Sequence, residues 1–211
     1  YLIIANIHNI AKKNDESFIL KTYICNLICR KMLKSILLFF RKRKIRNNLQ
    51  HKMLMQFPDI AKFPVISILV DESQKSNIKE MEAFVKKSFN PKKLRFIIIS
   101  DVIPDNILQS EFMNFIMKED FNRLGVLKKE KEDMLKSFSD DIFINLSDNN
   151  EDLLNDYIVS NIRSSFKIGH SKLNMGMHDL VIDYGIEKND VERLKILYKY
   201  ILMLSGNNDE K

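Results

Sequence analysis

Short apolar runs, separated by segments with helical spacing, dominate the middle of this chain. Val65–Val70, Leu94–Ile99 and Ile142–Leu146 are rich in isoleucine, valine and leucine. Runs that are apolar at most positions are typical of strands covered on both faces, as in a parallel sheet. We therefore predict an α/β fold: a single three-layer Rossmann-like domain with a mainly parallel sheet.

The remaining elements follow from the same spacing rules. We predict helices over 75–89, 128–138, 151–163 and 187–204, short strands at 166–169 and 180–183, and an edge strand or a helical turn at 111–117. The domain is expected to span 57–205, with a solvated tail at 206–211. Asn90-Pro91 closes the first of these helices.

The formal net charge of +6 is concentrated in one segment. Residues 30–52 hold nine basic residues and no acidic one, whereas the chain from residue 53 onward carries a net charge of −4. Residues 32–56 contain no Gly or Pro, and their apolar residues recur at helical spacing, which predicts a basic amphipathic helix before the domain. The candidate polyanion contacts in this helix are Arg41, Lys42, Arg43, Lys44 and Arg46.

Three interpretations of this helix stay open. It can pack one face on the domain and solvate its charges. It can lie on an anionic membrane, with Leu37–Phe40 inserted and Arg41–Lys44 on the headgroups. It can also contact RNA or DNA phosphates in a salt-sensitive way, although aromatic residues do not interleave with the basic ones as on a base-stacking surface. A protein partner is a further candidate.

The start of the chain and its cysteine content bear on its location. The first methionine is Met32, so we expect residues 1–31 to be a non-native or disordered extension. Neither this stretch nor 32–40 is long and apolar enough to form a transmembrane segment. Two cysteines in 211 residues favour a reducing compartment. The expected location is therefore cytoplasmic, with a peripheral position at the inner membrane as the alternative.

The sequence contains no recognisable cofactor motif. None of the five glycines forms a dinucleotide-binding or phosphate-binding loop, so we expect no cofactor. The histidines have no metal-ligand spacing, and we expect His170 and His178 to flank a loop rather than to bind a metal. No nucleophile–histidine–acid arrangement stands out, which makes an enzyme the less favoured class.

Four aspartates occupy the most suggestive positions. Asp71, Asp101, Asp148 and Asp183 each lie at or just after the end of a predicted strand. Ligands of open α/β sheets bind at that edge, and paired carboxylates there can bind a hydroxyl group or act as a base. Aspartate is also favoured for capping and turning where a strand meets a helix, so both interpretations remain.

A group of segments resembles a known family. Asp141–Ser147, Tyr157–Ser160, Phe166–Gly169 and Asp179–Asp183, with Phe121-Asn122 and Leu124-Gly125, resemble an uncharacterised bacterial domain of unknown function found chiefly in Bacteroidetes. That resemblance implies no activity and supplies no catalytic residue.

Asp141–Leu146, the helix that follows and Lys167–Gly169 are also distantly similar to the N-terminal half of lipopolysaccharide heptosyltransferases. That likeness implies a glycosyltransferase-like fold. However, Asp71-Glu72-Ser73 stands where those enzymes carry a glycine-bearing loop.

The leading functional hypothesis is therefore a non-catalytic interaction or scaffold protein that uses its basic helix. The alternative is a small-ligand-binding or glycosyltransferase-like module with a site at the strand ends.

Overall fold

The computed structural model describes residues 31–50, 54–59, 62, 64–101, 112–149, 151–170, 175–185 and 189–205. The expectations for residues 1–30 and for the tail at 206–211 lie outside these ranges.

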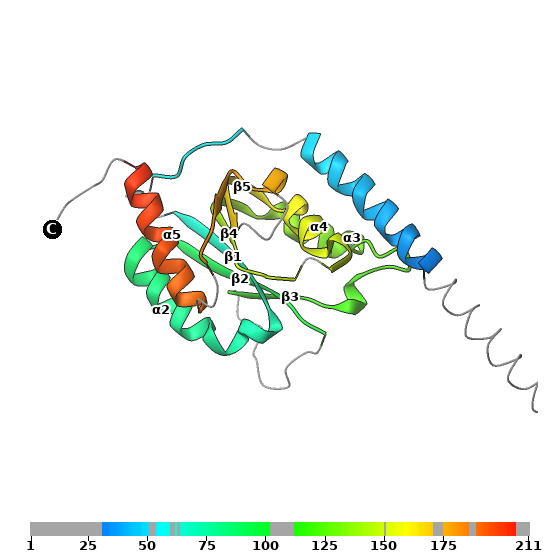
Figure 1. Ribbon diagram of the computed structural model, residues 1–211, viewed down its shortest axis with the longest axis horizontal. Helices are drawn as coiled ribbons and strands as arrows, with labels where there is room; N and C mark the ends of the chain where they lie inside the picture. Colours follow the sequence, from blue (N-terminus) through cyan, green and yellow to red (C-terminus); the bar gives the residue numbers. More distant parts are fainter. Residues whose placement is uncertain are drawn as a thin grey trace, which may run out of the picture.

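A six-stranded sheet forms the centre of the protein (Figure 1). Its order is β3-β2-β1-β4-β5-β6, and every neighbouring pair is parallel. This confirms the predicted α/β class, and the order is the one found in dinucleotide-binding folds. The strands are β1 (Val65–Asp71), β2 (Lys93–Ile99), β3 (Met113–Ile116), β4 (Ser139–Asn145), β5 (Arg163–His170) and β6 (Leu180–Ile182).

Helices cover both faces of the sheet (Figure 1). The four predicted helices are present, and each begins later than expected because a 3-10 turn or an extended residue precedes it. The segment at 111–117, left open above, contains the edge strand β3. One face carries α2 (Ile78–Phe89) and α5 (Asp190–Leu204), and the other carries α3 (Lys129–Ser137), α4 (Leu154–Asn161) and the helix α1 described over residues 31–50.

The strands divide their side chains between two cores. In β1, Ile68 and Val70 are buried toward α2 and α5, whereas Leu69 between them is buried toward α1, α3 and α4. Each such burial stabilises the fold by about 1.5–3 kcal/mol. The register places Asp71 level with Ile99 and Leu69 level with Asn145, so the carboxyl ends of β1, β2 and β4 meet at one edge.

Residues 54–59, between α1 and β1, lie along the opposite, amino edge of the sheet (Figure 1). Residues 54–56, expected to be helical, are not; residues 51–53 are not described. The Gln56 N–H donates to the Ser165 carbonyl at 3.0 Å, and the Phe57 ring packs edge-on against Phe166. This segment therefore connects the α1 face of the sheet to the α5 face.

Candidate functional site

Asp71 lies where the strand order reverses, between β1 and β4. Ligands of this fold class bind in the crevice outside that point. Here the Asp71 carboxylate accepts hydrogen bonds from the Ser147 hydroxyl at 2.6 Å and from the backbone N–H groups of Asp148 and Asn149 at 2.9 and 3.2 Å. The N–H groups that could hold a phosphate therefore already bind a carboxylate of the chain itself.

The other three aspartates separate from one another. The Asp148 carboxylate lies 3.0 Å from Nη1 of Arg193 on α5 and 3.3 Å from Nε2 of His170 at the end of β5. Asp101 is exposed after β2 and shares a cavity with Asp71. Asp183 follows β6 and accepts a turn hydrogen bond from the Gly185 N–H at 3.0 Å. The structure thus places Asp101 in the same cavity as Asp71 and the backbone of Asp148 against Asp71, while the Asp148 carboxylate turns away and Asp183 lies elsewhere.

His170 and His178 lie at the two ends of the segment that joins β5 to β6, as expected, but both are buried. His170 is the last residue of β5 and is buried, with Nε2 at 3.2 Å from the Ser147 carbonyl oxygen. His178 is also buried, packs over Gly169 and lies at hydrogen-bond distance from the Asn145 amide. Both histidines therefore belong to a polar layer beside the carboxyl ends of β4 and β5.

Two adjoining cavities open between α1 and the carboxyl edge of the sheet. Their volumes are about 450 Å³ and about 380 Å³. They share six lining residues, so they form one continuous hollow, which we call the α1 hollow. The shared residues are Leu37, Arg41, Ile99, Ser100, Asp101 and Leu154.

Arg41 lines both cavities of this hollow and is only 7% exposed. Its Nε donates to the Gly125 carbonyl at 2.8 Å, its Nη1 donates to the Asp152 carbonyl at 2.9 Å, and its guanidinium lies 5.5 Å from the centre of the Phe121 ring. Burial lowers the pKa of Arg41 from its ordinary value, and the nearby Asp152 carboxylate opposes this effect. The sequence placed Arg41 on a polyanion-binding surface, whereas its side chain turns inward.

Further contacts fix α1 on the body. Lys34 forms a 2.7 Å ion pair with Asp152, and Lys44 forms a 3.1 Å ion pair with Glu132. The Asn48 amide donates to Ser160 and Asn161, both at 3.1 Å. Asp152 has a left-handed backbone conformation. Its carbonyl accepts a hydrogen bond from Arg41 and its carboxylate pairs with Lys34, so it contacts two residues of α1.

The outward face of α1 carries two kinds of side chain. Residues 32, 36, 39, 43 and 46 recur at spacings of four and three, so they share one face of the helix. Met32 and Phe39 are 60% and 61% exposed, and Ile36 is exposed as well. The exposed basic residues follow one turn later. They are Lys42, Arg43 and Arg46.

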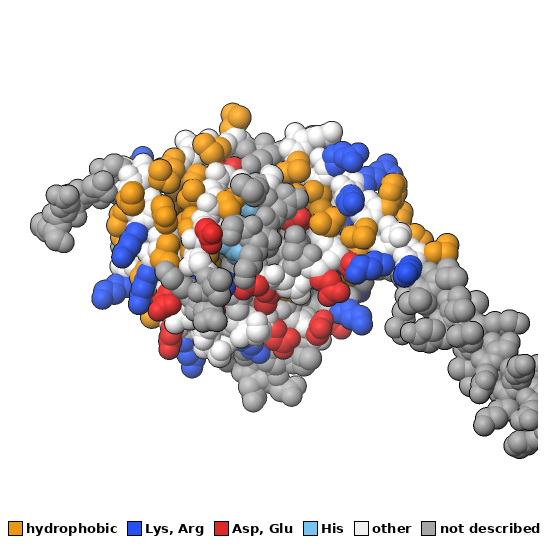
Figure 2. Space-filling model, viewed as in Figure 1, with side chains coloured by type: hydrophobic (Ala, Val, Ile, Leu, Met, Phe, Trp, Pro, Cys, Tyr) orange, Lys and Arg blue, Asp and Glu red, His pale blue; other side chains and the backbone are white. Residues whose placement is uncertain are grey.

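Figure 2 shows hydrophobic and basic side chains following each other along this helix. The face differs from the sequence expectation, because Leu37 and Phe40 in the segment 37–40 turn partly toward the body. We call Met32, Ile36, Phe39, Lys42, Arg43 and Arg46 the outer face of α1.

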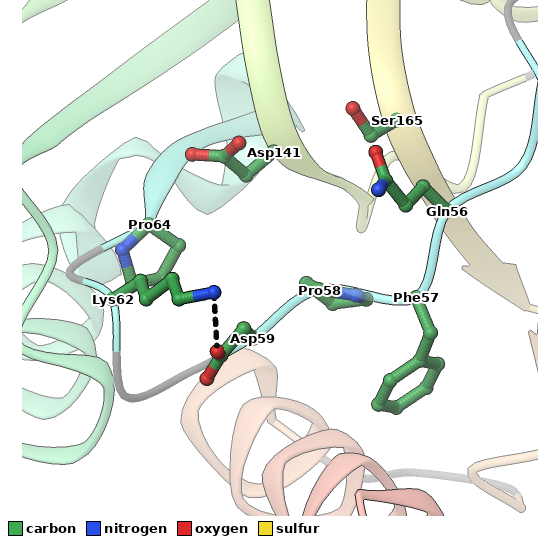
Figure 3. A pocket seen from close by; sticks show the side chains of 8 residues that line it. All are labelled: Gln56, Phe57, Pro58, Asp59, Lys62, Pro64, Asp141 and Ser165. Carbon is green, nitrogen blue, oxygen red and sulfur yellow. Dashed lines mark ion pairs between the residues drawn. The ribbon is translucent and has the colours of Figure 1, made fainter.

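A smaller hollow of about 230 Å³ lies at the amino edge of the sheet (Figure 3). Its lining includes Lys62, which pairs with Asp59 at 3.2 Å. The Asp141 carboxylate at its rim accepts a 2.7 Å hydrogen bond from the Val65 N–H. These groups hold the start of β1 in place.

The described residues form neither a metal-binding cluster nor a membrane-spanning helix. No three His, Cys, Asp or Glu side chains within those ranges are placed to hold a metal ion. None of the helices described is long and apolar enough to cross a bilayer.

Comparison with known proteins gives one match. A family model described as a family of unknown function, DUF6913, matches residues 38–204. No curated protein and no solved structure matches the chain.

Proposed function

Because the chain belongs to the DUF6913 family, whose function is unknown, we propose a function from its own geometry: it is a non-catalytic interaction protein whose α1 outer face contacts an anionic membrane surface. The supporting observation is that α1 is docked through one face while its opposite face exposes apolar residues followed by basic ones. Under this proposal the chain is cytoplasmic, where the anionic lipid headgroups lie.

The apolar half of the outer face favours a membrane over a nucleic acid. Met32, Ile36 and Phe39 offer no hydrogen-bond donor to a phosphate, but an interfacial helix buries such residues at the boundary between headgroups and acyl chains. Lys42, Arg43 and Arg46 then lie at the level of the headgroups. An RNA-binding surface would instead favour stacking residues distributed among the cations.

The docked face of α1 supports the same interpretation. Arg41, Lys44 and Asn48 are engaged with the body, so the helix presents its outer face in a fixed orientation. A helix that is already folded loses little conformational entropy when it binds a surface. The body then acts as the part of the protein that is brought to the membrane.

Co-sedimentation with vesicles tests this proposal. We expect the full chain to bind vesicles containing phosphatidylglycerol, to bind neutral phosphatidylcholine vesicles far more weakly, and to release as salt rises. Replacing Lys42, Arg43 and Arg46 by Gln should remove about 1 kcal/mol for each charge, which together reduces binding about a hundredfold.

A matched control carries the same change of charge on the other face of the sheet. Lys79, Lys86 and Lys87 on α2 are exposed, and their triple replacement by Gln should leave vesicle binding unchanged. Equal losses in both triple variants, or binding to RNA without binding to vesicles, would contradict the proposal.

A further inference from the structure

We propose that the smaller cavity of the α1 hollow binds a small amphiphilic anion, a carboxylate or phosphate monoester joined to a short apolar tail. This inference does not depend on membrane binding, because it concerns the inner face of α1. It assigns the anion to Arg41, Lys118 and Arg123, which all line the smaller of the two cavities.

Arg41 provides the anchoring charge. Both of its hydrogen bonds go to neutral carbonyl oxygens, and no carboxylate among the described residues forms an ion pair with it. The nearby Asp152 carboxylate favours this charge but forms its ion pair with Lys34, and a buried cation that is not ion-paired is costly. Because a guanidinium carries five N–H donors and Arg41 lines both cavities, donors remain for a ligand oxygen.

The larger cavity is acidic, because Asp71, Glu72, Asp101, Glu151 and Asp152 line it beside Arg41 as its one described cation, so the anion is assigned to the smaller cavity. The Asp71 carboxylate accepts three hydrogen bonds from residues 147–149, the loop after β4. The Asp152 carboxylate pairs with Lys34. Glu72 accepts a 3.3 Å hydrogen bond from the Asp101 N–H. The smaller cavity holds Asp101 as its one described carboxylate against three cations, so its net charge is positive.

The wall of the smaller cavity supplies the place for a tail. It is formed by apolar side chains from α1, β2, β3 and α4 and by an aromatic ring from the segment between β3 and α3. These are Leu37, Ile99, Ile116, Leu154 and Phe121. A cavity of about 380 Å³ lies within the range of small-molecule sites. An apolar wall with cations at one end matches an amphiphile better than a free inorganic anion.

Titration calorimetry of the full chain at low salt, without vesicles, tests the proposal. The probes share one tail and differ in head group: octanoate, octyl phosphate, octylamine and 1-octanol, with inorganic phosphate as the probe without a tail. We expect octanoate and octyl phosphate to bind with 1:1 stoichiometry, and octylamine, 1-octanol and inorganic phosphate to bind at least about tenfold more weakly.

Variants locate the site. Arg41 also anchors α1, so the first variant is the double change Lys118→Gln and Arg123→Gln, both exposed at the rim. It should weaken octyl phosphate binding about fivefold or more. Arg163→Gln, at the opposite edge of the sheet, should have no effect. Binding of octylamine or phosphate as tight as octyl phosphate, no binding of either octyl anion, or equal affinities of the two variants would overturn the proposal.

Discussion

The Nε atom of Arg41 donates a hydrogen bond of 2.8 Å to the carbonyl oxygen of Gly125, across 84 positions of the sequence. Gly125 also has a positive φ of 70°, and the side chain of Leu37 packs directly on its α-carbon. The turn that contains Gly125, just before α3, is thus bound by Leu37 and Arg41, two residues of α1 that lie one helical turn apart. This relationship fixes which face of α1 is turned inward and which is left exposed.

Replacing Gly125 with Ala should loosen α1. The new Cβ would overlap the Cγ and Cδ1 atoms of Leu37, at a cost of about 1–3 kcal/mol, beside about 1–2 kcal/mol for the left-handed backbone. We expect a lower free energy of unfolding in urea and faster hydrogen exchange in residues 37–48.

Gly185 is the matched control for this change. Its φ is 72°, but a Cβ there would meet nothing within 4 Å. Gly185→Ala should therefore cost the backbone component alone, without faster exchange in α1. If the two variants were equally destabilised, the contact with Leu37 would not hold the helix.

Docking of α1 should weaken in acid through Glu132. Burial alone would raise the pKa of Glu132, but hydrogen bonds from Lys136 and Lys44 outweigh it and hold the pKa below its usual value. The ionised carboxylate therefore stabilises the fold. This contribution is complete above the pKa of about 4.5 in the unfolded chain and is lost as the pH falls through the lower folded value.

The pH dependence can be read from urea unfolding of the wild type and of Glu132→Gln, followed by circular dichroism. The difference in free energy of unfolding between them should be largest near pH 7 and should shrink toward pH 3. A difference that stays constant with pH would show that the ion pairs of Glu132 do not contribute.

Asp71→Ala should destabilise the edge of the sheet where the strand order reverses. Its carboxylate binds the Ser147 hydroxyl and two backbone N–H groups, so we expect a loss of about 2–3 kcal/mol. Asp101→Ala, at an exposed carboxylate of the same hollow, should change stability by less than about 0.5 kcal/mol. If Asp71→Ala and Asp101→Ala lowered the free energy of unfolding in urea by equally small amounts, Asp71 would not anchor the loop after β4.

The fold class could be predicted from the sequence because the apolar runs in β1, β2 and β4 are buried on both faces. The length of β5 could not be predicted, because the sequence indicated a strand only at 166–169 and the strand spans Arg163–His170. Its polar residues hide the strand pattern, and the buried Lys167 donates from its Nζ to the Val159 carbonyl at 2.9 Å. Arg95 and Asp140 are likewise charged residues of strands that are buried. They form an ion pair inside the sheet layer, and burial raises the pKa of Asp140 to about 6 against the effect of Arg95.

The candidate site was less predictable. Strand ends could be located, and with them Asp71 and Asp101, but the direction of each carboxylate depends on contacts distant in sequence. The inward position of Arg41 depends on the carbonyls of Gly125 and Asp152, and no local pattern in residues 32–56 indicates it.

The most direct measurement uses the absence of tryptophan from the chain. Phe39→Trp places a single tryptophan on the outer face of α1, and Tyr200→Trp places one at an exposed position of α5. With phosphatidylglycerol vesicles, the emission of Phe39→Trp should shift to the blue and be quenched by brominated acyl chains, whereas that of Tyr200→Trp should not change. Emission of Phe39→Trp that is unchanged by these vesicles would contradict membrane contact through α1.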